Sequence, residues 1–277
     1  MGLEAETAAR ALLEFWAAAG VDLDDARALL RARAPVAPRQ FTQSAPVQSA
    51  RPKAPTPDPS PARRPTPAPL EDARRAAAAA TTIAELRAAV AAFEGCGLKA
   101  TARTTVFGDG MEGADVLLIG EGPGREEDEQ GKPFVGRSGQ LLDRMLASIG
   151  LGRTANVFIS NVVYWRPPGN RPATQGELAA CLPFVDRLIA LTNPKLLVLA
   201  GGVAAQTVLR KSEGVTKLRG RRLSHVNPEL TKPINTMVML HPAYLLRQAR
   251  HKRLAWADLL ALEAWLDELG AARNPRL

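Results

Sequence analysis

The chain has 277 residues, 46% of them hydrophobic, which is enough for a soluble protein with a sizeable core. Its formal net charge of +8 favours a polyanionic partner such as nucleic acid. No apolar segment is long enough to cross a membrane, and the N-terminus is acidic where a signal peptide is basic, so we expect a cytoplasmic protein with no membrane partner.

Residues 1–33 are expected to form a small helical hairpin. Leu12 and Trp16 share one face, Gly20 interrupts the pattern, and Asp24 begins a second helical segment. Such a hairpin buries too little apolar surface to fold firmly alone.

Residues 34–70 are rich in proline, serine, threonine and arginine and contain almost no large apolar residues. A segment of this composition cannot offset its ordering entropy, so we expect a disordered linker. Two interpretations remain open. The linker is either a plain spacer or a basic tether that holds DNA weakly by its charge.

Residues 71–277 are predicted to form one folded domain in which helices and strands alternate. The predicted strands are residues 116–119, 157–163, 196–200 and 237–240. The predicted helices are residues 82–93, 138–149, 174–191, 203–209 and 254–269. This order predicts an α/β fold, a three-layer sandwich around a central, mainly parallel four-stranded sheet.

Residues 116–139 combine a buried strand, a glycine-rich turn, an acidic cluster and a second glycine-rich turn. The first turn, residues 120–124, lies at the carboxyl end of its strand, where open α/β sheets bind ligands. Its glycine spacing fits neither a dinucleotide fingerprint nor a phosphate-binding P-loop. Three more loops follow strands and are expected at the same edge, namely residues 161–171, 201–202 and 241–247.

The loops carry short motifs in a fixed order. They read Gly-Glu-Gly-Pro-Gly at 120–124, Glu-Asp at 127–128, Gly-Lys-Pro-Phe-Val-Gly at 131–136, Asn161 with Arg-Pro-Pro-Gly-Asn-Arg at 166–171, His-Pro at 241–242 and Leu-Leu-Arg at 245–247. Over about residues 96–266 the chain resembles family 4 uracil-DNA glycosylases. The resemblance implies an enzyme that removes uracil from DNA in base excision repair, and we expect a monomer.

The resemblance also implies a uracil-binding set and a catalytic pair. These are Gly122, Glu127, Phe134 and Asn161 for uracil binding, and Glu121 and His241 for catalysis. The Asn161 amide offers a donor and an acceptor to O4 and N3–H of uracil, and the Phe134 ring can stack on the extruded base. His241 can donate a hydrogen bond to O2 as negative charge builds on the departing base.

The Glu121 carboxylate can orient water and offset positive charge on the sugar. By resemblance, Glu127 lies near C5 of the base and obstructs the thymine methyl group. Each residue alone also has an ordinary structural explanation: asparagine as a turn or cap residue, histidine in a loop, phenylalanine in the core. Their joint occurrence favours the functional interpretation.

The candidates for DNA contact follow the last two predicted parallel strands. Gly202 opens a helix whose amides could bind a phosphate, and Lys217 and Arg219 lie in the next basic loop. The segment that resembles the family's wedge, which fills the gap left by the extruded base, consists of Leu245, Leu246 and Arg247. A core role for one of the two leucines stays open.

Family 4 enzymes usually hold an iron–sulfur cluster with four cysteines, but this chain has two, Cys96 and Cys181. By resemblance, Phe93 and Trp165 occupy the other two ligand positions. Neither can ligate iron, so we expect no metal and no cofactor, as in a branch of the family without the cluster. The chain also lacks the basic, histidine-bearing insertion of the branch that becomes covalently attached to DNA, so we expect turnover.

Two alternatives from other classes remain. One is a DNA-binding module that recognises uracil without excising it. The other is a nucleic-acid scaffold whose partner binds residues 1–33.

Overall fold

The computed structural model of the chain describes residue 17 and residues 67–273. Apart from residue 17, the predicted hairpin and the predicted linker up to residue 66 lie outside the described residues. Helix α3 (Pro67–Ala79) begins four residues before the predicted start of the domain at 71. In the described part of the chain, no helix combines the length and apolar character that a membrane crossing requires.

One six-stranded sheet forms the centre of the molecule, with the strand order β1-β3-β2-β4-β6-β5. Its strands are β1 (Gly108–Gly110), β2 (Val116–Gly120), β3 (Val157–Asn161), β4 (Leu196–Ala200), β5 (Leu223–His225) and β6 (Ile234–Met239). The four inner strands are parallel, which confirms the predicted mainly parallel sheet. The short edge strands β1 and β5 are antiparallel and were not predicted.

The inner strands are buried on both faces. Along β2, Val116 and Leu118 belong to one apolar core, whereas Leu117 and Ile119 belong to the other. This alternation explains why the strand reads as an unbroken apolar run in the sequence.

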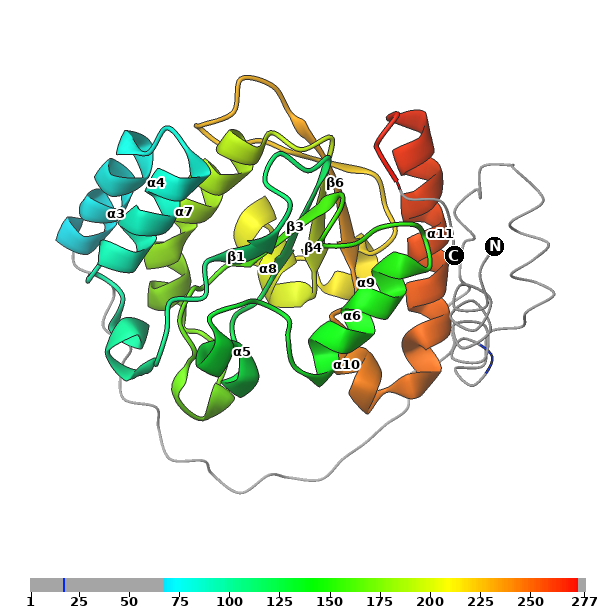
Figure 1. Cartoon of the computed structure of the whole chain (residues 1–277), viewed down its shortest axis with the longest axis horizontal. Helices are drawn as coiled ribbons and strands as arrows, with labels where there is room; N and C mark the ends of the chain where they lie inside the picture. Colours follow the sequence, from blue (N-terminus) through cyan, green and yellow to red (C-terminus); the bar gives the residue numbers. More distant parts are fainter. Residues whose placement is uncertain (1–16, 18–66, 274–277) are drawn as a thin grey trace.

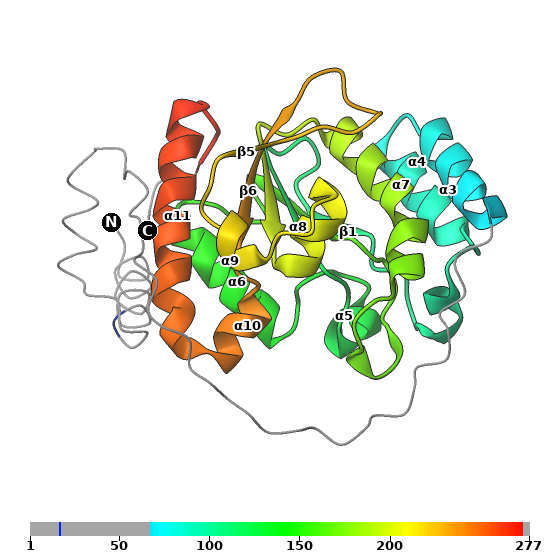
Figure 2. The same cartoon turned by 180° about the vertical axis from the view of Figure 1, so that it is seen from behind.

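Helices cover both faces of the sheet, so the predicted three-layer sandwich is confirmed (Figures 1 and 2). One layer contains α3, α4 (Ile83–Ala92), α7 (Gln175–Thr192) and α8 (Gly202–Leu209). The other contains α6 (Arg137–Ala147), α10 (Pro242–Arg247) and α11 (Lys252–Glu268). The shorter elements are α5 (Arg125–Gln130), α9 (Val215–Leu218), η1 (Gly97–Thr101), η2 (Pro168–Asn170) and η3 (Ala249–His251).

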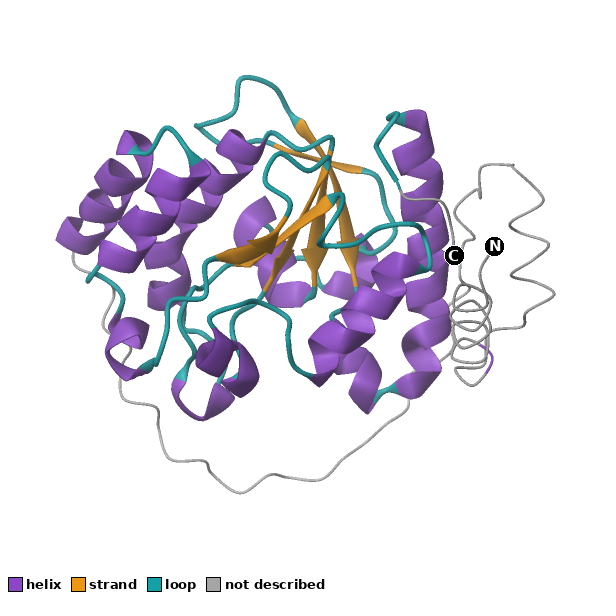
Figure 3. Cartoon of the chain, in the orientation of Figure 1, coloured by secondary structure: helices purple, strands orange, loops and turns teal. Residues whose placement is uncertain are grey.

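The carboxyl ends of the four parallel strands meet at one edge of the sheet, the lower edge in Figure 3. Strands β2 and β3 end there at Gly120 and Asn161, and β4 ends at Ala200. Strand β6 ends two residues before His241. The fold therefore brings the four predicted loops together.

Candidate active site at the carboxyl edge of the sheet

Three side chains from distant parts of the chain meet over the end of β2. A Cβ atom at Gly120 would lie 2.6 Å from Phe134 Cε2 and 2.7 Å from Asn161 Oδ1, so both side chains lie directly over this glycine. The rings of Phe134 and His241 are neighbours, with centroids 5.5 Å apart and planes tilted by 30°. A side chain at position 120 would displace this arrangement.

Asn161 is buried without hydrogen-bond partners. Its side chain is 1% exposed, and neither Oδ1 nor Nδ2 has a partner in the structure. Burying polar atoms unpaired is unfavourable, and natural proteins satisfy nearly all such groups. The Asn161 amide is therefore available to a ligand that presents both an acceptor and a donor.

Phe134 occupies a backbone region that is unfavourable for a large side chain, with φ of 54°. Helix α6 lies so close that a Cβ atom at Gly139 would overlap the Phe134 carbonyl group. Strained residues of this kind persist only where their surroundings fix them, and they concentrate at functional sites.

His241 is held as a neutral hydrogen-bond donor. Its Nδ1 accepts a hydrogen bond from the Ala243 amide at 3.1 Å, at the N-cap of α10. The proton of the neutral ring therefore resides on Nε2. Burial, and secondarily the charge of Arg247, lowers the pKa of His241 to about 4, so the ring carries no charge near neutral pH.

Glu127 joins the two glycine-rich turns. Its Oε2 accepts the Gly124 amide at 3.0 Å. Its Oε1 accepts the amides of Val135 and Gly136 at 3.0 and 2.9 Å. This structural role was not predicted, although Glu127 occupies the third position of α5, where a carboxylate commonly reaches back to cap a helix.

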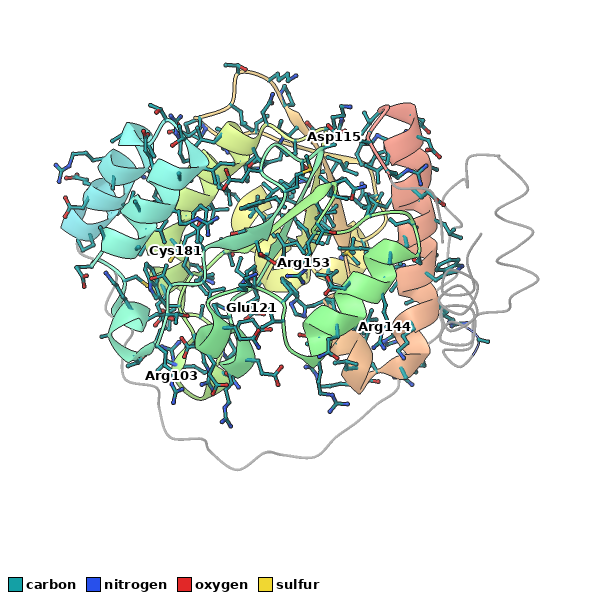
Figure 4. The ribbon with its side chains drawn as sticks, viewed as in Figure 1. Arg103, Asp115, Glu121, Arg144, Arg153 and Cys181 are labelled. Atoms are coloured by element: carbon teal, nitrogen blue, oxygen red, sulfur yellow. The ribbon has the colours of Figure 1, made fainter. Side chains whose placement is uncertain are left out.

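Glu121 follows β2 directly and lies at the lower end of the sheet beside α5 (Figure 4). Burial raises the pKa of its carboxyl group, and the nearby Arg247 opposes that shift. Among the described residues, no side chain forms a hydrogen bond or ion pair with this carboxylate. At the adjacent Gly122, a Cβ atom would lie 2.6 Å from Val163 Cγ2, so this turn is packed against the loop after β3.

The predicted wedge divides into a buried and an exposed leucine. Leu245 is fully buried in the core, whereas 40% of Leu246 is exposed. Leu246 is therefore the better placed of the two to enter DNA. Arg247 is exposed, and its charge lowers the pKa of both Glu121 and His241, which places it beside the site.

The residues predicted to contact DNA phosphates differ in whether their donor groups are free to do so. Lys217 is exposed, and no ion pair engages it in the described part of the chain. Gly202 is the first residue of α8, directly after β4. Arg219, however, donates to both oxygens of Asp258 at 2.7 and 3.0 Å, and its side chain is only 16% exposed. This buried ion pair favours a structural role for Arg219 over phosphate binding.

The residues at the expected cluster positions do not fit an iron–sulfur cluster. Phe93, Cys96, Trp165 and Cys181 all belong to one apolar core. The Cys181 thiol is fully buried among apolar side chains, and neither Phe93 nor Trp165 carries a group that can ligate iron. The described residues contain no group of three or more histidine, cysteine or acidic residues arranged to hold a metal.

The family model of the Uracil DNA glycosylase superfamily matches residues 107–260, more than half of the chain and all of the candidate site. The chain therefore belongs to the uracil DNA glycosylase superfamily. It is 35% identical over 178 residues to the type-4 uracil-DNA glycosylase of Thermotoga maritima, covering 63% of this chain and 90% of that protein.

Two further relatives carry the same description. The type-4 uracil-DNA glycosylase of Sulfurisphaera tokodaii is 34% identical over 182 residues, which cover 64% of this chain and 81% of the relative. The enzyme of Archaeoglobus fulgidus is 39% identical over 153 residues, which cover 54% of this chain and 76% of the relative.

Proposed function

We propose that the chain is a uracil-DNA glycosylase of base excision repair. It extrudes uracil from DNA and hydrolyses the N-glycosidic bond, which leaves free uracil and an abasic site. The observation that carries this proposal is the buried, unpartnered Asn161 amide beside the rings of Phe134 and His241. Membership of the uracil DNA glycosylase superfamily supports it.

Asn161 reads the pairing edge of the base. Its Nδ2 donates to O4 of uracil, and its Oδ1 accepts from N3–H. Cytosine presents an amine donor at the position of O4 and no proton on N3, so both atoms would lack partners. A buried site built to hydrogen-bond one pattern discriminates strongly against a ligand that leaves its groups unpaired. The Phe134 ring stacks on the face of the extruded base.

His241 stabilises the leaving group. As the C–N bond breaks, the bonding electrons move to uracil and negative charge develops at O2. The Nε2–H of neutral His241 donates to this oxygen, where charge is larger in the transition state than in the ground state. The lowered pKa keeps the ring in this form at physiological pH.

Glu121 acts at the sugar. Departure of uracil leaves a C1′ centre with oxocarbenium character, and a carboxylate next to it offsets the positive charge. The same carboxylate orients the water whose oxygen bonds to C1′. That water gives up one proton, and the departing uracil anion takes up one proton to leave as neutral uracil. Arg247 favours the ionised form of Glu121, because it opposes the effect of burial on the pKa.

DNA is held around this site by charge and by a wedge. Lys217 and Arg247 contact phosphates, and the α8 amides at Gly202 receive another. Leu246 fills the gap that the extruded nucleotide leaves in the stack. We propose that a monomer suffices, because one chain supplies every one of these residues.

An excision assay tests the proposal. A uracil-containing oligonucleotide is incubated with the protein and then treated with alkali, which cleaves the strand only at an abasic site. Cleavage at the uracil position is expected, and the matched thymine oligonucleotide should stay intact. Binding without cleavage would instead support the alternative of a recognition module without turnover.

The excision rate should show no inflection at the pH where an ordinary histidine ionises. Because the pKa of His241 is lowered from 6.5 to about 4, its ring stays neutral until the pH falls towards 4. We expect no inflection from His241 near pH 6.5 in single-turnover rates measured from about pH 5 to 8. Any loss at the acid end should come from protonation of Glu121 and be absent in Glu121→Gln. An inflection near 6.5 that disappears in His241→Gln would contradict the assignment.

Removal of residues 1–66 should leave the single-turnover rate unchanged, since every candidate site residue lies between 121 and 247. At most, DNA binding at low salt should weaken, because the linker part of the removed segment, from residue 34 onward, is basic. A deletion of residues 1–79 serves as the comparison: it also removes α3, whose Ala73 and Ala77 are buried in the core, and should unfold at lower temperature. A folded 1–66 deletion without excision activity would refute this expectation.

A further inference from the structure

The turn that carries Phe134 is held from two sides by opposite charges. After Phe134, the amides of Val135 and Gly136 donate to Glu127 Oε1 at 3.0 and 2.9 Å. On the other side, Arg153 donates from Nη1 to the Pro133 carbonyl at 3.0 Å and from Nη2 to the Phe134 carbonyl at 2.8 Å. One carboxylate and one guanidinium therefore bind one backbone group from each of four consecutive residues of this turn, 133–136.

These bonds determine where the Phe134 ring lies. With φ of 54°, Phe134 is in a region that a bulky residue seldom adopts, and its carbonyl group is pressed against Gly139. A conformation of this kind reverts to a relaxed one unless several contacts fix it. In this backbone conformation, the Phe134 ring lies over Gly120 and beside His241. Release of the carbonyl groups would let the ring move away from both.

Arg153 is itself rigidly anchored. Its guanidinium donates to Asp109 on β1 at 3.0 Å and to Asp143 on α6 at 3.0 and 3.1 Å, and its side chain is 16% exposed. Figure 4 labels Arg153 between the sheet and α6. The planar fork of arginine suits this set of acceptors, and the single ammonium group of lysine cannot reproduce it.

We propose that Arg153 is a positioning residue for base recognition. It holds the Phe134 ring at the height and tilt needed to stack on the extruded uracil, and it does not touch the base. This inference rests on the proposed function, because it requires Phe134 to stack on a base. Neither the motifs nor the candidate site residues include Arg153, which lies in the connection between α6 and β3.

A double-mutant cycle tests the proposal. Single-turnover excision is measured for the full chain, Arg153→Met, Phe134→Leu and the double variant. Loss of a well-placed stacking ring should reduce the rate about tenfold or more. If Arg153 acts through Phe134, the double variant should lose no more than Phe134→Leu alone. Arg153→Lys, which keeps the charge but not the fork, should recover only part of the rate.

Arg273→Met is the matched control. Arg273 is equally buried, at 17% exposure, and donates to Glu263 and to the Ile149 carbonyl, away from the turn. It should lower stability and leave the excision rate unchanged. If Arg153→Met does not fold, the cycle is run with Arg153→Lys.

Independent, additive losses in the cycle would overturn the proposal, and so would an unchanged rate in the Arg153 variants. Hydrogen exchange at the Val135 and Gly136 amides distinguishes two outcomes. In one, Arg153 does not hold the turn; in the other, the chain excises no uracil. Exchange should be faster in Arg153→Met than in the unmodified chain even if that chain excises no uracil. Unchanged exchange would show that Arg153 does not hold the turn.

Discussion

Replacement of Asn161 or His241 by alanine should reduce the single-turnover rate of uracil excision on the order of 100-fold to 1000-fold, which is typical for loss of a donor at a site of developing charge. Asn161 supplies the only buried amide in the described part of the chain whose two polar atoms both lack partners. His241 supplies a neutral donor beside the Phe134 ring. Full rates in both variants would show that the site is elsewhere.

Two matched residues provide the controls. Asn156 is also buried, but its side chain bonds the Gly152 amide and the Gly150 carbonyl. His225 is buried on the edge strand β5, and burial also lowers its pKa to about 4. Asn156→Ala and His225→Ala should destabilise the fold and retain the excision rate.

The two asparagine variants should also differ in stability, and here Asn156→Ala should be the more affected of the two. Asn156→Ala breaks buried hydrogen bonds and should lower the free energy of unfolding by about 1–3 kcal/mol. Asn161→Ala removes polar atoms that have no partners, so it should be close to neutral. A binding residue kept unpaired for its ligand sacrifices some stability for function.

Trp165→Ala should destabilise the protein by roughly 3–5 kcal/mol, because it opens a cavity in the core. The Trp165 ring is 1% exposed, and its Nε1 donates to Thr105 Oγ1 at 3.0 Å. We propose that Trp165 and Phe93 fill the volume in which the family resemblance implies a cluster. Phe93 contacts Phe184 edge-on, with ring centroids 5.1 Å apart. Denaturant unfolding of the variant measures the loss.

Iron and sulfide analysis of protein purified without oxygen completes this test. We expect no stoichiometric iron, and Cys96→Ser and Cys181→Ser should release none. Stoichiometric iron and sulfide, lost in either cysteine variant, would contradict the apolar core at this position and assign the chain to the cluster-bearing enzymes.

Strands β2 and β4 could be predicted because burial on both faces leaves an unbroken apolar run. Strand β6 was predicted only from residue 237, because Asn235 and Thr236 interrupt the apolar run after Ile234. Helix α7 could be predicted from its capping box, and the structure contains that box: the Thr174 amide donates to Glu177 Oε2 at 2.7 Å. The edge strands escaped prediction because three residues are too few for a periodic pattern, and β1 reads Gly-Asp-Gly. The buried face of α3 includes Ala73 and Ala77, which lack the large apolar side chains that mark an amphipathic helix.

The meeting of Asn161 and His241 followed from the rule that loops after parallel strands share one edge. Phe134 lies between α5 and α6, and only the family resemblance assigned it to the same site. No such rule predicts which acidic residue pairs with a given arginine. Arg219 lies in a basic loop by sequence, yet it bonds Asp258, 39 residues further along the chain. Arg153 reaches Asp109 across 44 residues. Such pairings depend on tertiary packing, which local patterns do not encode.

Measurement of free uracil, with DNA in molar excess over the protein, tests most directly whether the chain excises uracil and turns over. We predict that released uracil exceeds the amount of protein several-fold, that the strand carries abasic sites, and that the protein remains unattached to DNA. Absence of free uracil under conditions in which the folded protein binds the DNA would contradict the proposed glycosylase activity. Release that stops at one equivalent with the protein covalently bound would contradict turnover.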